Sequence, residues 1–213
     1  MPRKPTMPGV DRRQLILEAA LSVFAERGFE AATNKDITER AGVNQGLIYF
    51  YFESKADVFF AAFEYHARLV MAQLDAVFEE VDDEDPATGL AWLLRRIVTV
   101  LDTPRAINLL RIMHQVRGSR TPSGALSSQE KQRSIGMLAE HIGQRLYEYL
   151  EAQIARGALR PVKAGLAAYL MTATLISSIG ARGQGGQEQP SQQALADTIA
   201  LLFCYGLLPR DTG

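Results

Sequence analysis

Residues 33–55 read TNKDITERAGVNQGLIYFYFESK, and this stretch decides the fold. Thr33 and Asp36 have the spacing of a capping box, which predicts a short helix directly after Thr33. Gly42 ends that helix, because glycine adopts a positive φ without steric cost. Asn44 can cap a second short helix. The stretch therefore predicts two short helices joined by a tight turn.

Two short helices joined by a tight glycine turn form a helix-turn-helix unit. We expect the first helix over residues 34–40 and the second over residues 45–51. In such a unit the second helix lies in the major groove of DNA, where its outward side chains meet bases or phosphates. The apolar side chains that can face inward are Ile37, Ala41, Val43 and Ile48. The candidates for the outer face of the second helix or its edge are Gln45, Leu47, Tyr49, Phe50 and Tyr51.

Helical periodicity continues on both sides of this stretch. Apolar residues recur at three- and four-residue spacing before it, which predicts a helix that stops at Gly28. A second capping box at Ser54 opens a series of amphipathic helices, and no segment alternates as a strand does. We expect an all-α chain of nine helices, with a three-helix helix-turn-helix domain over residues 1–53 and a six-helix domain over residues 54–213.

The composition is that of an ordinary globular protein. The 213 residues are 47% hydrophobic and 22% charged, with a net charge of −1. This balance excludes a chain that is basic throughout, although it allows a local basic surface. A single cysteine, Cys204, cannot form an internal disulfide, and the N-terminus lacks the apolar core of a signal peptide. We therefore expect a cytoplasmic protein.

No catalytic or metal-binding pattern stands out. The three histidines, His66, His114 and His141, do not have the His-Glu-x-x-His spacing of a zinc enzyme. No Glu-x-x-His pair and no glycine-rich phosphate loop occurs. We expect a protein that is not an enzyme, with no catalytic residues, no metal and no cofactor.

Residues 13–59 resemble the N-terminal domain of the TetR family of transcriptional regulators. The matching residues are Ile16-Leu17-x-Ala19-Ala20, Phe24-x-x-x-Gly28-Phe29, Thr33-x-x-Asp36-Ile37, Ala41-Gly42-Val43 and Gly46-x-x-Tyr49-x-Tyr51-Phe52-x-Ser54-Lys55. The resemblance covers about a quarter of the chain, and beyond it only length and layout match. It implies that the protein binds double-stranded DNA, that the six rear helices receive a ligand, and that the last two helices form a dimer.

The resemblance also implies which residues contact DNA. They are Thr33, Lys35, Gln45, Gly46, Leu47, Tyr49, Phe50, Tyr51 and Lys55. Thr33 and Lys55 match phosphate-contacting positions at helix starts, and Gln45 matches a position whose amide can pair with adenine. A basic N-terminal arm that includes Arg3 and Lys4 can lie along phosphates or in a minor groove, or be a solubilising tail.

Other positions leave more open. Lys35 matches a position that reaches a base or a phosphate, but a solvated lysine is the alternative. Tyr49 and Tyr51 match positions that meet the DNA backbone, and Tyr49 can equally belong in part to the core. Leu47 departs from the pattern, because a small polar residue is common there. This departure leaves the DNA sequence that the protein prefers undetermined.

The last two helices, expected over about residues 162–179 and 191–208, are too apolar to stay exposed in a monomer. The first of them contains an uncharged run over residues 164–181, whose length is at the lower limit for a membrane span. Because the run contains threonines, serines and glycines, a helix buried against a partner explains it better. A homodimer through these helices would place two recognition helices about one DNA turn apart, on a palindromic site. No membrane association is expected.

The resemblance further implies a small-molecule effector that releases DNA by a population shift. Polar or soft side chains at otherwise apolar positions suggest a mostly apolar or aromatic effector with a few polar anchors. These candidates are His66, Trp92, Asn108, Met113, His114, Arg117, Tyr147 and Met171. The sequence favours a repressor, with an activator or a helical interaction protein that no longer binds DNA as the alternatives.

Overall fold

The computed structural model describes residues 11–81, 86–118, 128–180 and 191–207. These residues form nine α-helices and no strand, which confirms the predicted all-α fold. The first three helices are α1 (Arg12–Ala31), α2 (Asn34–Ala41) and α3 (Gln45–Tyr51). The remaining helices are α4 (Lys55–Glu80), α5 (Pro86–Leu101), α6 (Pro104–Gly118), α7 (Ser128–Ala155), α8 (Ala164–Gly180) and α9 (Gln192–Leu207).

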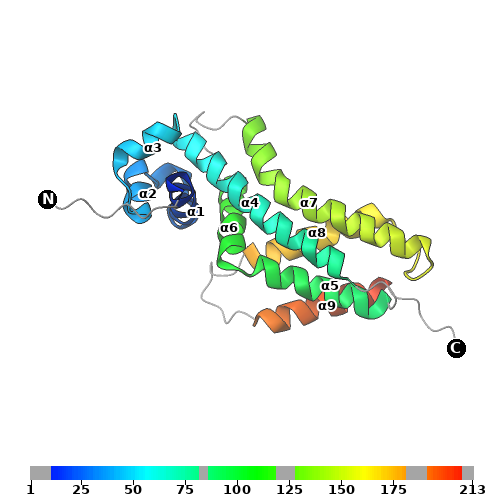
Figure 1. Cartoon of the computed structure of the whole chain (residues 1–213). Coiled ribbons are helices and arrows are strands. Elements are labelled where there is room, and N and C mark those ends of the chain that lie inside the picture. The colour runs from blue at the N-terminus through cyan, green and yellow to red at the C-terminus, as the bar shows by residue number, and fades with distance from the viewer. Residues whose placement is uncertain (1–10, 82–85, 119–127, 181–190, 208–213) are drawn as a thin grey trace.

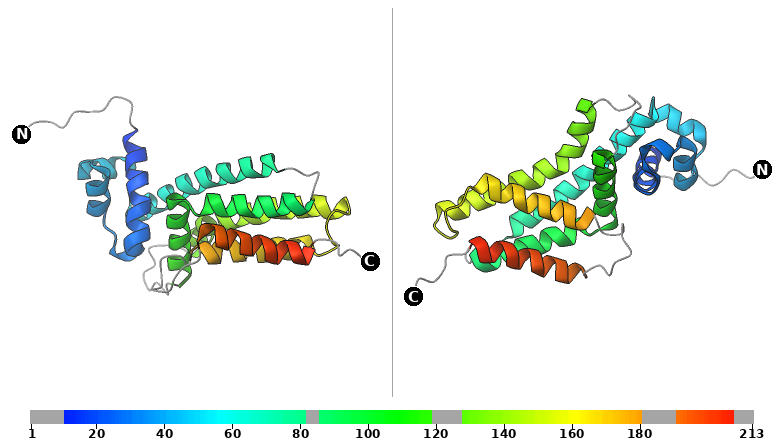
Figure 2. Two further views of the ribbon diagram at one scale, coloured as in Figure 1. Left: turned by 90° about the horizontal axis from the view of Figure 1, so that it is seen from below. Right: turned by 180° about the vertical axis from the view of Figure 1, so that it is seen from behind.

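Helices α1, α2 and α3 form an N-terminal cluster at one end of the molecule (Figure 1). Helix α4 leads from this cluster into a rear bundle, in which α5 packs along α9 and α7 packs along α8 (Figures 1 and 2). The cluster touches the bundle mainly where α1 packs on α4 and α6. Among the described residues, no helix is both long and apolar enough to cross a membrane.

The capping signals set the starts of the short helices. The Thr33 hydroxyl accepts from the Asp36 amide at 3.1 Å while the Asp36 carboxylate accepts from the Thr33 amide at 3.0 Å, so the predicted capping box forms. Gly42 follows α2 with a φ of 68°, and the Asn44 side chain accepts from the Leu47 amide at 3.0 Å. These local bonds set where α2 begins and ends and where α3 begins.

At two other helix ends the structure departs from the prediction. Helix α1 does not stop at Gly28: it kinks there, with a φ of 75°, and continues to Ala31. The extra turn is held by packing, because the Phe29 ring lies edge-on to Phe59 of α4 at 5.3 Å. At the start of α4, Ser54 accepts from the Asp57 amide, but the Asp57 carboxylate accepts from the amide of Glu53 instead of Ser54.

A buried histidine connects the cluster to the bundle. His66 of α4 is 1% exposed, its Nε2 lies 3.2 Å from the Leu17 carbonyl of α1, and its Nδ1 accepts from Arg105 Nε of α6 at 3.1 Å. A carbonyl can accept but not donate, and a guanidinium can donate but not accept, so His66 must be the neutral Nε2–H tautomer. Burial lowers the pKa of His66, and the hydrogen bond to the Leu17 carbonyl and the charge of Glu18 only partly oppose this effect.

This lowered pKa predicts acid sensitivity. Between the folded and the unfolded pKa of His66 the unfolded chain binds more protons, so the stability contributed by neutral His66 is present above about pH 6.5 and is lost as the pH falls. The free energy of unfolding of the parent protein should fall below that pH by up to about 1.4 kcal/mol per pH unit. Urea titrations of the parent and His66→Gln between pH 7.5 and 5 measure this, and an equal slope in both would contradict it.

Candidate nucleic-acid interface

A groove on the N-terminal cluster gathers five of the nine predicted DNA-contacting residues. It has a volume of about 340 Å³ and lies between the end of α1, the starts of α2 and α3 and the start of α4. Its lining residues are Glu30, Ala32, Thr33, Asn34, Lys35, Gln45, Tyr49 and Lys55. Residues separated by 22 positions in the chain, Thr33 and Lys55, are thus brought to one surface.

Helix α3 is attached to the cluster by one face. Of its seven residues, Ile48 is buried completely, and Leu47 is half-buried against the core. Tyr49 is 60% exposed and Phe50 is 77% exposed, so the partly buried alternative for Tyr49 is not what the structure shows. A short helix with large side chains projecting from the end of the molecule has the shape required to enter a DNA groove.

The remaining predicted residues lie around the same helix. Gln45 and Gly46 are exposed at its start, beside the groove. Tyr51 is exposed at its end, where its ring meets Phe50 edge-on at 5.0 Å. This pair gives α3 an aromatic tip, and aromatic rings on this scale offer both apolar contact and, for tyrosine, a hydroxyl donor.

Thr33 is already engaged in the cap. Its hydroxyl donates to Asp36 Oδ2 at 2.7 Å, and Asp36 also pairs with Arg27 at 2.7 Å. The hydrogen bond from Thr33, with that from Arg27, holds the pKa of Asp36 below its usual range. The Thr33 hydroxyl would therefore have to break its hydrogen bond to Asp36 before it could donate to a phosphate.

Lys55 is likewise committed within the protein. Its ammonium donates to the carbonyl oxygens of Phe29 at 2.8 Å, Ala32 at 3.1 Å and Glu30 at 3.2 Å, and it lies 4.6 Å from the centre of the Phe29 ring. An ammonium has three hydrogens, so these three carbonyls use all of them. Lys55 therefore closes the free carbonyl end of α1 and joins it to α4. A direct bond to phosphate would have to replace one of these contacts.

Removal of this ammonium should destabilise the cluster. Lys55→Met keeps much of the contact with the Phe29 ring but leaves three carbonyls without their donor, and we expect a loss of roughly 1–3 kcal/mol in the free energy of unfolding. The matched control is Lys35→Met, because Lys35 is exposed and its one partner among the described residues is Glu39, at 3.8 Å. Urea unfolding measures both, and equal stability of the two variants would contradict the assigned role of Lys55.

Sequence reasoning missed Asn34, the first residue of α2. Its side-chain oxygen is buried beside the groove and has no hydrogen-bond partner among the described residues. An unpaired buried acceptor is costly, so it marks a place where a donor from outside is favourable. No pattern in the sequence separated Asn34 from other residues that follow a cap.

Among the described residues, two ion pairs at the surface of the cluster join α1 to α2. Arg40 donates to both carboxylate oxygens of Glu26 at 2.5 and 2.7 Å, and Arg27 pairs with Asp36. The bond from Arg40 is the main reason that the pKa of Glu26 is lowered.

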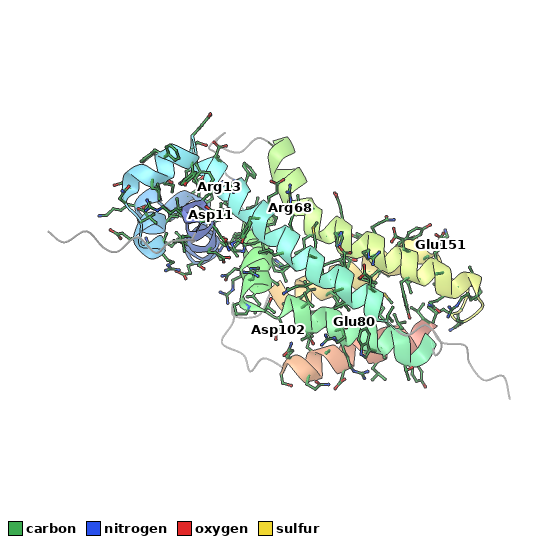
Figure 3. All side chains as sticks on the ribbon, in the orientation of Figure 1. Asp11, Arg13, Arg68, Glu80, Asp102 and Glu151 are labelled. Carbon is green, nitrogen blue, oxygen red and sulfur yellow. The ribbon has the colours of Figure 1, made fainter. Side chains whose placement is uncertain are left out.

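Near the start of α1 the Arg13 guanidinium lies 5.4 Å from the Phe52 ring centre, and Figure 3 shows Arg13 with Asp11 in the cluster. Arg3 and Lys4 of the predicted arm lie outside the described residues.

The eight predicted effector-binding residues are not gathered around one cavity. His66 and Asn108 line a cavity of about 400 Å³ between α1, α4 and α6, whereas Tyr147 lines a groove of about 480 Å³ between α7 and α8. The others are distributed elsewhere. Met113 and Met171 are in the core, Trp92 lies under Arg96, His114 contacts Gly180, and the side chain of Arg117 lies outside the described residues.

The described part of the chain contains no cluster of side chains suited to a metal ion. No three His, Cys, Asp or Glu side chains there are close enough to hold a metal ion. Cys204 is buried, and burial raises the pKa of its thiol. The thiolate form is therefore disfavoured at this position.

Comparisons with known proteins agree with the geometry. The sequence profile described as "Bacterial regulatory proteins, tetR family" matches residues 16–62. The HTH-type transcriptional regulator SrpR of Pseudomonas putida is 29% identical over 75% of this chain and 87% of its own length. The uncharacterized HTH-type transcriptional regulator YfiR of Bacillus subtilis (strain 168) is 37% identical, over 38% of this chain and 37% of its own length.

The fold as a whole is also shared. The transcriptional regulator FadR from Bacillus subtilis, solved in complex with stearoyl-CoA, superposes with a TM-score of 0.72 at 21% identity, over 91% of this chain and 98% of its own. The chain spans between about a quarter and a half of the length of several curated relatives that it matches. The profile match over the DNA-binding segment, the relatives and the nine-helix architecture lead to one assignment. The chain belongs to the TetR family of transcriptional regulators.

Proposed function

We propose that the protein is a homodimeric, DNA-binding transcriptional repressor in the cytoplasm, without enzymatic activity. In this proposal α3 lies in the major groove, and each protomer reads one half of a palindromic site. The observation that carries the proposal is the position of α3, which belongs to the cluster at one end of the molecule (Figure 1). It is attached through the buried Ile48 and exposes Tyr49 and Phe50.

The groove beside α3 supports the same proposal. Lys35 and Gln45 line it with exposed side chains, and the side-chain oxygen of Asn34 has no hydrogen-bond partner among the described residues. Lys35 supplies positive charge for the phosphate backbone, while Gln45 supplies a donor and an acceptor for a base edge. Lys55 contributes by holding the end of α1 in place. We assign residues 1–53 to DNA binding and residues 54–213 to ligand binding and dimerisation.

The proposed dimer uses an apolar face on α8 and α9. These two helices contact each other, and both expose large apolar side chains. The apolar face consists of Leu166, Tyr169, Leu170, Leu201, Leu202 and Tyr205. The last three are 64%, 65% and 80% exposed, which is unfavourable in water and typical of a surface that a partner covers. A symmetric four-helix contact between two copies would bury it.

The effector that we propose is a small, mostly apolar molecule that binds within α4–α9. The groove of about 480 Å³ between α7 and α8 is lined in part by the apolar side chains of Ala139, Ala168 and Ile176, which favours an apolar ligand over a charged one. Stearoyl-CoA, present in the Bacillus subtilis FadR structure, carries a long apolar chain of this kind. A ligand that prefers a dimer with a different distance between its two α3 helices would release DNA.

A gel shift with fragments of the genome that encodes the chain tests the DNA-binding proposal. In excess non-specific competitor, a small number of fragments should stay bound. Because phosphate contacts release counterions, their affinity should fall linearly with the logarithm of salt concentration. The proposal fails if no fragment is retained, or if all fragments are retained equally.

A further inference from the structure

Among the described residues, hydrogen bonds from Arg105 and Gln115 join α6 to α1. Arg105, in the first turn of α6, donates from Nη2 to Glu18 Oε1 at 3.4 Å. Gln115, near the other end of α6, donates from Nε2 to the carbonyl of Ala25 at 3.0 Å. Arg105 and Gln115 are ten positions apart, which is about 15 Å along the helix axis. Helix α6 therefore holds α1 at two separated points, which prevents α1 from pivoting about a single contact.

The first of these contacts is itself held in place by a buried group. Arg105 Nε donates to His66 Nδ1 at 3.1 Å, and His66 Nε2 donates to the carbonyl of Leu17. His66 is almost completely buried, so its ring cannot turn away. Three helices, α1, α4 and α6, thus meet at one guanidinium, which lies between a carboxylate of α1 and an imidazole of α4.

Near Arg105, α1 is not packed on every side. A cavity of about 400 Å³ lies there between α1, α4 and α6. Its lining includes Glu18, Leu21, Ser22, His66, Arg105 and Asn108. Side chains that border open space can move at little cost in dispersion energy, whereas close-packed ones cannot. The polar contacts therefore matter more for the orientation of α1 here than they would in a filled interface.

Helix α1 carries the recognition helix with it. The ion pairs of Arg27 and Arg40 join α1 to α2, and α3 packs on both α1 and α2. We infer that Arg105 and Gln115 are positioning residues for DNA recognition, which set the direction of α3 relative to the apolar face and so the spacing of half-sites that the dimer accepts. This inference rests on the proposed function, because spacing has meaning only for a dimer that binds DNA.

Operator spacing tests the inference. The probe is a duplex selected by the parent protein, together with versions that carry one or two base pairs inserted between the half-sites. Each insertion moves one half-site by about a tenth of a DNA turn. Affinity of the parent protein should fall about tenfold or more per insertion, within the usual cost of a defective site. In the double variant Arg105→Gln/Gln115→Ala the loss of affinity per inserted base pair should be less than about threefold. Loosely held α3 helices can follow the displaced half-site.

A loss of stability alone would not change the ratio between a variant's affinities for the duplex with an insertion and the duplex without one. Arg95→Gln is the matched control: it removes the 2.6 Å contact between Arg95 and Asp197 within the rear bundle and should keep the penalty of the parent. Glu18→Gln weakens the contact from the α1 side and should relax the penalty in part, even if the double variant does not fold. Equal penalties in the parent, Glu18→Gln and the double variant, or no penalty in the parent, would overturn the inference. A parent protein that binds no duplex would overturn the proposed function itself.

Discussion

Replacement of Leu202 by glutamate should convert the proposed dimer into monomers and remove most of its affinity for DNA. Leu202 belongs to the apolar face and is 65% exposed in the single chain, so dimerisation would bury its side chain. An unpaired carboxylate at that position would have to be buried without a partner, which costs several kcal/mol. Because each α3 would then bind alone, the loss of the linked second half-site should weaken DNA binding by roughly 10²- to 10⁴-fold.

Sedimentation and fluorescence anisotropy measure the two parts of this prediction. The control is Ala72→Glu, which adds the same charge at an exposed position on α4 and should leave both the mass and the affinity unchanged. A Leu202→Glu variant that stays dimeric would show that α9 does not form the interface. A monomeric variant that binds the operator as tightly as the parent would refute the paired arrangement of the recognition helices.

Ile48→Ala should have the second large effect, on the stability of the N-terminal cluster. Ile48 is the buried residue through which α3 is attached, and large-to-small changes at such positions cost about 2–5 kcal/mol. Hydrogen exchange should show the loss of protection in α2 and α3, while α8 and α9 keep theirs. Ile48→Val, which removes one methylene, should cost about 0.5–1.5 kcal/mol. Unchanged protection of α3 in Ile48→Ala would contradict this account of how the helix is held.

Local chemistry explains why much of the fold is predictable from the sequence. The capping box at Thr33 and the positive φ at Gly42 involve residues that are neighbours in the chain, so their pattern is visible without knowledge of the fold. The sequence predicts a helix end at Gly28, where the helix kinks and continues. The continuation depends on the packing of Phe29 on α4, which involves residues distant in sequence and is therefore not visible in the local pattern.

The candidate sites likewise combine features that local sequence predicts with features that depend on contacts between distant residues. The exposed positions of Gln45 and Phe50 follow from helical periodicity in the recognition helix. The contacts of Lys55 do not, because its three carbonyl partners lie 23 to 26 residues away. The sequence indicates the proposed effector residues by their residue type alone. Which of them share a cavity depends on how six helices pack, and Tyr147 and His66 consequently line different spaces.

Selection of bound duplexes from a random-sequence pool, with the parent protein and with Gln45→Ala in parallel, is the most direct test of the claim that α3 reads DNA as one of a symmetric pair. The parent should enrich an inverted repeat. Because an amide that pairs with a base is worth about 1–3 kcal/mol of discrimination, Gln45→Ala should lose base preference at one symmetric position in each half-site. A pool without an inverted repeat, or the same consensus from both proteins, would contradict the claim.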